Sequence, residues 1–238
     1  MIKIHSVCLI IDSDYPFREH YARQRLLWKK YMNLDPEIKC FFIRLSETIS
    51  SDIVVDESNN IIYVKGKEEY IPGILIKTLK AMEYVYNTFD FDYLIRTNIS
   101  TFWNFKLYKN KFSTPKNNLI EAIIGLIDNL PFPSGYGMVI SKDVIFKMIT
   151  LQDEFDYSLN DDVSIGKFLY DKNIPIISAK NYVYHFIYHL SQNEILSRIH
   201  SNIDKIYQFR IVYDRGLQDN YIFNNLYTLS YNPLNYLS

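Results

Sequence analysis

The sequence is poor in cysteine and glycine and has no long apolar run. Only two of its 238 residues are cysteine and seven are glycine. Two cysteines make no disulfide framework, and Cys8 and Cys40 both lie in apolar segments, which is typical of buried, reduced thiols. No apolar run reaches the ~20 residues that span a bilayer, and no basic segment with a longer apolar run opens the chain. We therefore expect a cytoplasmic protein without a signal peptide or transmembrane span.

A strong charge of either sign is also absent. The chain carries 26 Lys and Arg against 27 Asp and Glu, a formal net charge of −1. Without a broad electrostatic field, binding to nucleic acid or to an anionic membrane is not expected. Walker loops, Cys/His zinc spacings and the G-x-S-x-G motif are missing as well. Hydrophobic residues, in contrast, are abundant: they make up 48% of the chain, which has 21 Tyr and 15 Phe. This content is enough to build a well-formed core.

The first hundred residues alternate between strand-like and helix-like segments. The apolar, β-branched run "IHSVCLII" (residues 4–11) is typical of a strand buried on both faces. After it we expect a helix over 17–32, strands over 38–45 and 60–66, a helix from 72 to 89, and a strand ending in "RTNIS". This order predicts an α/β fold with a doubly wound, mostly parallel central sheet flanked by helices. Ligands bind outside the carboxyl ends of such strands, so Asp12, Asp14, Arg96 and Asn98 are predicted to face one site.

The second half of the chain is less regular. Residues 117–127 fit a helix or a strand, and "PFPSGYGMVIS" is interpreted as a Pro/Gly turn that leads into a strand. Ser141 is expected to cap a helix that runs to about residue 151. Further elements are predicted as a helix over 160–173, strands over 174–178 and 182–190, and a helix over 219–229. With no repeat or linker, we expect one domain over 1–238, with a nucleotide-binding half (about 1–105) and an acceptor and catalytic half (about 106–238).

Asp161 and Asp162 are the carboxylates best suited to chemistry. They open a predicted helix, where acidic residues commonly cap the chain and complement the helix dipole. The same position favours the ionised carboxylate, which can accept a proton from a hydroxyl held against it. The capping and catalytic interpretations are compatible.

Gly135, Tyr136 and Gly137 form a second candidate feature. A turn is the default explanation for two close glycines. In a functional site the glycines would let the backbone approach a ligand closely, and Tyr136 would offer a flat surface on which a sugar ring could stack.

Taken in order, four segments resemble the β-1,3-galactosyltransferase and Fringe class of glycosyltransferases (family 31 and its viral and bacterial relatives). They cover the middle half of the chain and read "YIPGILIKTLKAMEYV", "FDYLIRTNIST", "PSGYGMVISKDV" and "NDDVSIGKFLYDKNIPI". In that family an "LKT"-like helix precedes a strand ending in metal-binding aspartates, followed by an "sGgGYvlS"-like segment and an acidic E/D-D-V-x-x-G motif. The places of these motifs are taken by Lys77-Thr78, Thr97–Ser100, Ser134–Ser141 and Asp161–Gly166.

The resemblance implies a GT-A fold and transfer of a hexose or N-acetylhexosamine, with inversion, from a nucleotide sugar to a glycan or protein hydroxyl. The donor in this family is usually UDP-linked. The family's catalytic base maps onto Asp162, with Asp161 as its neighbour or substitute. Asp14 would lie near the nucleoside, and Gly135, Tyr136 and Gly137 would shape the acceptor side. The sugar, the acceptor, the linkage and the oligomeric state stay open.

The strand end departs from the family's pattern, because Asn98 and Ser100 stand where the metal-binding aspartates belong. Mg²⁺ and Mn²⁺ prefer carboxylate ligands. One explanation is an enzyme that holds no tight metal and binds the diphosphate through Arg96, Lys77 or Arg18, since arginine matches phosphate geometry. The other is a non-catalytic glycan- or nucleotide-sugar-binding protein on the same fold. We favour the first, because Asp161-Asp162 is retained.

Asp12-Ser13-Asp14 has the letters of a D-x-D motif but follows the first strand, where capping or contact with the nucleoside is the better interpretation. His185, in a strand with His189 on the same side, is the candidate for a late metal or phosphate contact, with a core or interface position as the alternative. A nucleotidyltransferase would need the acidic metal-binding cluster that "RTNIS" lacks.

Overall fold

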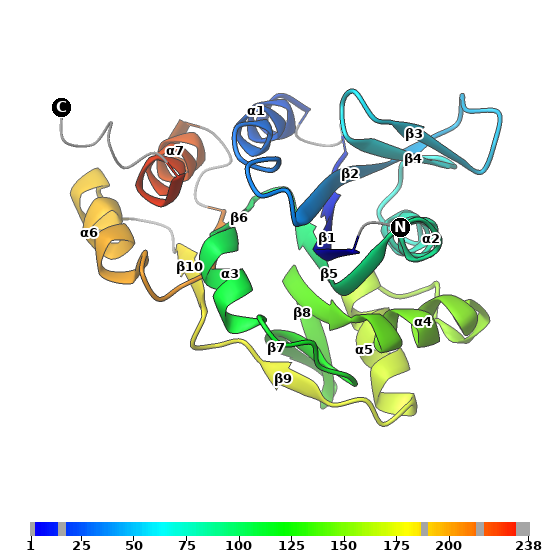
Figure 1. The fold of residues 1–238 in the computed structure, drawn as a ribbon. Coiled ribbons are helices and arrows are strands. Elements are labelled where there is room, and N and C mark those ends of the chain that lie inside the picture. Colours follow the sequence, from blue (N-terminus) through cyan, green and yellow to red (C-terminus); the bar gives the residue numbers. More distant parts are fainter. Residues whose placement is uncertain (1–2, 14–17, 187–189, 213–216, 232–238) are drawn as a thin grey trace.

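A central eight-stranded sheet organises the protein. The computed structural model describes residues 3–13, 18–186, 190–212 and 217–231, with Arg18 described by its backbone only (Figure 1). The predictions for Asp14, for His189 and for the side chain of Arg18 therefore lie outside the described residues. The strand order of the large sheet is β3-β4-β2-β1-β5-β8-β7-β9, and a second, three-stranded sheet has the order β10-β11-β6.

The first half of the chain follows the predicted order of elements. Its elements are β1 (Lys3–Ile11), α1 (Arg18–Lys29), β2 (Ile38–Ser46), β3 (Ile53–Asp56), β4 (Ile61–Lys65), α2 (Gly73–Thr88) and β5 (Asp90–Asn98). Strand β1 pairs in parallel with β2 on one side and with β5 on the other, and β2 pairs in parallel with β4. The expected α/β sheet with mostly parallel strands is confirmed. The short strand β3 was not predicted; it runs antiparallel to β4 at the edge.

The second half adds an antiparallel extension and the small sheet. Its elements are β6 (Thr101–Trp103), α3 (Phe105–Lys111), β7 (Ile120–Ile127), β8 (Leu130–Ser141), α4 (Lys142–Thr150), a 3-10 turn (Gln152–Glu154), α5 (Asp161–Asp171), β9 (Ile176–Ser178), β10 (Val183–Phe186), α6 (Gln192–Asn202), β11 (Gln208–Ile211) and α7 (Leu217–Tyr231). The ambiguous segment 117–127 forms a strand. The sequence analysis missed β6, α3, α6 and β11. None of the described helices is both long and apolar enough to cross a membrane.

The prediction of a turn at Gly135–Gly137 is wrong, because these residues lie inside β8. Gly137 pairs with Thr97 of β5 in an antiparallel register. A Cβ at Gly137 would lie 2.7 Å from Cζ2 of Trp103 and 2.8 Å from Nε2 of Gln208, so this glycine permits close packing of the small sheet against β8. The register between β7 and β8 shifts near Ala122, and such irregularities often occur beside functional sites.

Helix α4 begins after Ser141 as predicted, but the expected capping bond is absent. The Ser141 hydroxyl donates instead to the carbonyl of Leu119 (3.2 Å) and to Asp143 Oδ1 (2.6 Å). It therefore ties β8 to the segment before β7 rather than satisfying the helix N-terminus.

The two faces of the large sheet bury different side chains. Because side chains alternate along a strand, Cys8 and Ile10 of β1 face one apolar cluster and Val7 and Leu9 face the other. Figure 1 shows α2, α4 and α5 on the second face and α1, α3 and α7 on the side of the first. Cys8 and the neighbouring Cys40 are buried, free thiols, as expected.

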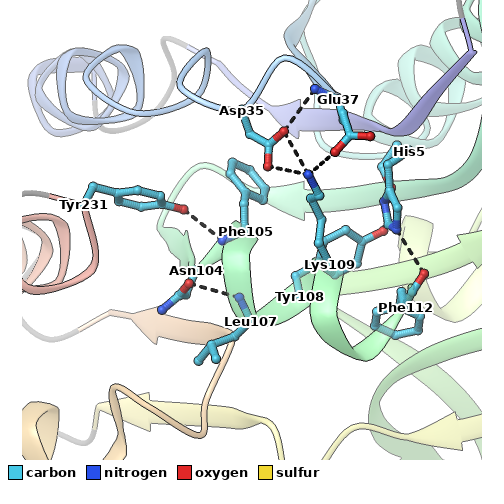
Figure 2. A network of polar contacts seen from close by, with 11 residues as sticks. His5, Asp35, Glu37, Asn104, Phe105, Leu107, Tyr108, Lys109, Phe112 and Tyr231 are labelled. Atoms are coloured by element: carbon cyan, nitrogen blue, oxygen red, sulfur yellow. Dashed lines mark hydrogen bonds and ion pairs between the residues drawn. The ribbon is translucent and has the colours of Figure 1, made fainter. Parts of the chain in front are cut away.

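Helix α3 is fastened at both ends by polar contacts (Figure 2). The Nζ atom of Lys109 forms ion pairs with Asp35, at 3.0 Å, and with Glu37. The backbone N–H of Phe105 donates to the hydroxyl of Tyr231 at 2.8 Å, and Asn104 caps the helix by accepting from the N–H of Leu107. The helix thereby links β6, which directly follows the end of β5, to α7 near the C-terminus.

Candidate functional site

A pocket of about 650 Å³ opens at the carboxyl ends of β1 and β5. Small-molecule sites typically have volumes of about 300–1,000 Å³. One wall comes from the ends of the two strands and from β11, and the other from α1, α2 and the loop before α2. The lining residues are Ile11, Asp12, Ser13, Tyr21, Glu68, Glu69, Tyr70, Ile74, Lys77, Asn98, Ile99, Ser100 and Arg210. The pocket thus lies where the predicted topology places a ligand site.

Asp12 anchors the end of β1. Its side chain is buried, and Oδ1 accepts a hydrogen bond from Nη1 of Arg25 at 2.8 Å while Nε of Arg44 lies 3.8 Å from Oδ2. Burial raises the pKa of Asp12, and the two guanidinium groups act against that rise. The carboxylate is therefore engaged by arginines from α1 and β2.

Lys77 is fully buried beneath the pocket. Its Nζ atom donates to the backbone carbonyl of Asp12 at 2.7 Å and forms an ion pair with Glu68. Burial lowers the pKa of Lys77, and the charge of Glu68 opposes this shift. The ammonium group thus joins α2, the loop before it and the end of β1, which gives it a positioning role in this arrangement.

Arg96 is buried and reaches the first turn of α5. Only 1% of the residue is exposed. Its guanidinium pairs with Asp161 and donates from Nη1 to the carbonyl of Gly135 at 2.7 Å and to Asn98 Oδ1 at 3.2 Å. Burial raises the pKa of Asp161, while Arg96 opposes the rise. Arg96 is not among the pocket-lining residues, so it ties the first turn of α5 to the end of β5.

Asp162 is held next to this ion pair by backbone donors. Its Oδ2 accepts from the N–H of Gly135 at 3.1 Å and its Oδ1 from the N–H of Val163 at 3.0 Å. A Cβ on Gly135 would lie 3.1 Å from Arg96 Nη1 and 3.3 Å from Asp162 Oδ2. The absence of a side chain at Gly135 therefore lets the arginine and the aspartate approach the same strand.

Tyr70 and Asn98 are the pocket-lining residues near Asp162. The pKa of the Tyr70 hydroxyl is raised by burial and then by the charges of Asp161 and Asp162. The Asn98 Nδ2 atom lies 3.7 Å from the point where Gly135 would carry a Cβ, close to the Asp162 carboxylate. The partly exposed Asp162 carboxylate is thus close enough to Tyr70 for its charge to act on that hydroxyl.

Arg210 is a site residue that the sequence analysis missed. It lies in β11, pairs with Thr101 of β6, and directs its guanidinium to the pocket, where it donates to Oγ of Ser100. Its guanidinium carbon lies 4.9 Å from the centroid of the Tyr136 ring. In the sequence Arg210 is a single basic residue between apolar neighbours in the short segment "QFRI", and this segment carries no motif.

His185 lies beside this arginine on the neighbouring strand. The two residues are paired in register between β10 and β11. The imidazole packs edge-on against Tyr136, with ring centroids 5.0 Å apart. Partial burial and then the charge of Arg210 lower the pKa of His185, so the neutral imidazole is favoured at pH 7.

The described side chains around the β5 end do not fit a divalent cation. Among the residues that the structure describes, no three His, Cys, Asp or Glu side chains gather into a group that could hold a metal ion. The strand end offers the amide of Asn98 and the hydroxyl of Ser100, and the guanidinium of Arg210 bonds to that hydroxyl. Mn²⁺ and Mg²⁺ require several carboxylate or water oxygens, and a guanidinium repels them.

The sheet order and the strand-end pocket define a GT-A-like α/β fold, and solved structures of that kind are similar to the chain. The glycosyltransferase involved in the glycosylation of the major capsid of PBCV-1 matches with 9% identity over 92% of this chain and 98% of that one, with a TM-score of 0.52. Galactosyltransferase LgtC, in complex with donor and acceptor sugar analogs, matches at 13% identity over 93% and 94%, with a TM-score of 0.47. The inositol-1-phosphate CTP transferase from T. maritima matches at 6% identity over 94% and 96%, with a TM-score of 0.49.

Comparisons of sequence give no such match. No family model matches the chain, and no curated protein matches it significantly. At 13% identity or less, the structural likeness concerns the fold alone. The predicted fold class is therefore confirmed, whereas membership of the β-1,3-galactosyltransferase and Fringe class stays a hypothesis.

Proposed function

We propose that this protein is an inverting glycosyltransferase that transfers a hexose or N-acetylhexosamine from a nucleotide sugar, UDP-linked by preference, to a hydroxyl of a glycan or protein. The observation that carries the proposal is the placement of Asp162. Two backbone N–H groups hold its carboxylate, which is partly exposed. Its charge acts on Tyr70, which lines a pocket large enough for a nucleotide sugar.

The proposed reaction is a single displacement with Asp162 as the base. The acceptor hydroxyl gives its proton to the Asp162 carboxylate as its oxygen attacks the anomeric carbon of the donor. The bond between that carbon and the diphosphate oxygen breaks, and the nucleoside diphosphate leaves with the bonding electron pair. Attack from the face opposite the leaving group inverts the anomeric centre.

The remaining site residues divide between binding and support. The ends of β1 and β5 would take the nucleotide, with Asp14 as a further proposed contact near the nucleoside and Arg18 as one at the diphosphate. Tyr136 and the adjacent glycines would form the acceptor side. We propose that Arg96 and Lys77 act as positioning residues, because each is already ion-paired with a carboxylate. Asn98 and Ser100 would face the diphosphate in a site that works without a tightly held metal, and the whole chain would form one domain.

The test is nucleotide release from a panel of UDP-sugars, with and without Mn²⁺, in the presence of mixed glycoside acceptors. Asp162→Asn should lower turnover about 10²- to 10⁴-fold, since that is the usual contribution of a general base. Asp171→Asn, at the far end of the same helix and exposed, is the matched control and should retain wild-type turnover. Equal turnover in wild type and Asp162→Asn would refute the proposed base.

The alternative is a non-catalytic protein that binds glycans or nucleotide sugars on the same fold. The departure from the acidic strand-end motif at Asn98 and Ser100 favours it. Tight binding of donors without release of nucleotide, across all donors and acceptors tried, would support this alternative.

A further inference from the structure

The geometry points to a subsite for the transferred sugar between Tyr70 and Asn98, in which the Tyr70 ring covers one face of the sugar and the Asn98 amide donates to one of its oxygens. This assignment rests on the proposed function and adds to it the residues that hold the group being transferred. Both residues line the pocket at the carboxyl ends of the strands. They come from different elements, Asn98 from the end of β5 and Tyr70 from the loop before α2.

The proposed displacement determines where the sugar lies. The nucleotide occupies the pocket and the base is Asp162, so the anomeric carbon lies between them. The acceptor oxygen attacks this carbon from the side of the base while the diphosphate leaves on the other side. The pocket-lining residues near Asp162 are Tyr70 and Asn98. The sugar that carries the anomeric carbon therefore lies beside both of them.

The Asn98 amide is oriented by Arg96. The guanidinium donates from Nη1 to Oδ1 of Asn98 at 3.2 Å, and because arginine has only donors, the atom that faces it is the amide oxygen. The Nδ2 group, with its two N–H donors, lies 3.7 Å from the point where Gly135 would carry a Cβ, and Asp162 Oδ2 lies 3.3 Å from the same point. The amide thus presents its donors on the side of the proposed base, where hydroxyl or carbonyl oxygens of a sugar can accept from them.

Tyr70 supplies an aromatic surface on the other wall. The residue is 67% exposed although it lines the pocket, so much of its side chain can contact a ligand. Tyrosine combines an apolar ring, suited to the C–H face of a sugar, with a hydroxyl that can donate or accept a hydrogen bond. Burial and then the charges of Asp161 and Asp162 raise the pKa of this hydroxyl. It therefore keeps its proton at neutral pH and can donate to a sugar oxygen.

The loop that carries Tyr70 is held on both sides of this residue. Before Tyr70, the Glu68 carboxylate accepts from the backbone N–H of Leu45 at 2.9 Å and forms an ion pair with Lys77. After it, the Tyr70 carbonyl accepts from the N–H of Ile74, in the first turn of α2, at 3.3 Å. A ring carried on a fixed backbone loses less conformational freedom when a ligand binds. These contacts therefore favour a preformed subsite.

The experiment compares UDP with UDP-glucose, UDP-galactose and UDP-N-acetylglucosamine by isothermal titration, without acceptor and with either EDTA or Mn²⁺. For the donor that the wild type binds most tightly, Tyr70→Ala should lower the affinity about 10- to 100-fold, since an aromatic contact and a hydrogen bond are lost together. The affinity for UDP should stay within about twofold of the wild type. Tyr70→Phe and Asn98→Ala each remove one hydrogen bond and should lower donor affinity about 2- to 10-fold.

Tyr170→Ala is the matched control. Tyr170 is 64% exposed, close to the value for Tyr70, but it lies on α5 and does not line this pocket. Its replacement should leave the affinities for UDP and for the donor unchanged. Thermal melts show whether each variant is folded.

Turnover in the wild type together with an unchanged ratio of donor to UDP affinity in Tyr70→Ala would overturn the subsite and leave the glycosyltransferase proposal intact. An equal loss of donor and UDP affinity in that variant would also overturn it, because Tyr70 would then contact the nucleotide. If Tyr70→Ala does not fold, the same ratio in Tyr70→Phe decides. An unchanged ratio in Asn98→Ala would overturn the part assigned to Asn98. A wild type that binds none of the donors and releases no nucleotide from them refutes the proposed function together with this inference.

Discussion

The guanidinium of Arg96 and the carboxylate of Asp161 form a buried ion pair that joins β5 to the first turn of α5. Both side chains are more than nine-tenths buried. Because Asp162 follows directly in the chain, the position of the proposed base depends on this pair. Arg96 therefore holds the first turn of α5 against β5 and does not line the pocket, whereas Arg210 does.

Removing Arg96 should strongly destabilise the fold. Arg96→Met would leave Asp161 buried without a partner, and breaking a buried pair in this way typically costs about 3–5 kcal/mol. Urea denaturation should show this loss in the free energy of unfolding. The double variant Arg96→Met/Asp161→Leu should recover much of it. As a control, Lys80→Met disrupts an exposed pair with Glu83 and should change stability by less than about 1 kcal/mol. Equal free energies of unfolding in Arg96→Met and in the double variant would contradict this account of the ion pair.

Lys77→Met should weaken all nucleotide binding equally. Lys77 fastens the end of β1 through the carbonyl of Asp12, so its loss should disturb the pocket wall rather than remove one phosphate contact. We expect the affinities for UDP and for uridine to fall by the same factor, together with a lower free energy of unfolding. A selective loss of UDP affinity would instead place Lys77 on the diphosphate.

Gly166→Ala should loosen α5 from β8. A Cβ on Gly166 would lie 2.4 Å from Cβ and 2.6 Å from Cα of Phe132. Because the second contact is with backbone, a change of rotamer cannot relieve it. Overpacking of this kind costs about 1–3 kcal/mol, which chemical denaturation would detect. Tyr170→Ala, on the exposed face of the same helix, provides the comparison and should have a smaller effect. Wild-type stability in Gly166→Ala would show that the helix can shift without cost.

The loop before α5 should contribute stability that disappears in acid. Hydrogen bonds from Ser158 and then from Lys167 lower the pKa of Asp156 from 3.8 to about 2. Since the folded state binds this proton less readily than the unfolded state, the contribution is complete above about pH 5 and is lost progressively as the pH falls toward about 1. Urea denaturation between pH 3 and pH 7 should therefore show wild type and Asp156→Asn converging at the acid end. A constant difference across that range would argue against a lowered pKa.

Patterns within single elements were readable from the sequence. An apolar run of strand length that ends in polar residues, such as residues 4–11, predicts a buried strand. The alternation of such strands with helices then predicted the mostly parallel sheet. The elements missed were short or polar. Helix α3, for example, is defined by contacts of Lys109 and Phe105 with residues far away in the chain, and local propensity does not reveal such contacts.

The glycines near residue 136 show why a local interpretation failed. Two close glycines normally indicate a turn. Here they serve the packing of Trp103, Gln208 and Asp162 against β8, and those partners come from three other parts of the chain. A sequence pattern cannot distinguish a glycine that bends the chain from one that makes room for a neighbour.

The sequence by itself determined the class of fold, the edge of the sheet at which the pocket opens and the acidic pair at the start of α5, because each depends on periodicity or on order along the chain. Only the tertiary structure showed that Arg210 lines the pocket and that Arg96 does not. Arg96 and Lys77 lie within the segments that resemble the glycosyltransferase family, but both are buried in ion pairs. Arg210 lies in β11, far away in the chain, in a segment that carries no motif. The cost of burying an unpaired charge is set by neighbours in space, and those neighbours exist only after the sheets have packed together.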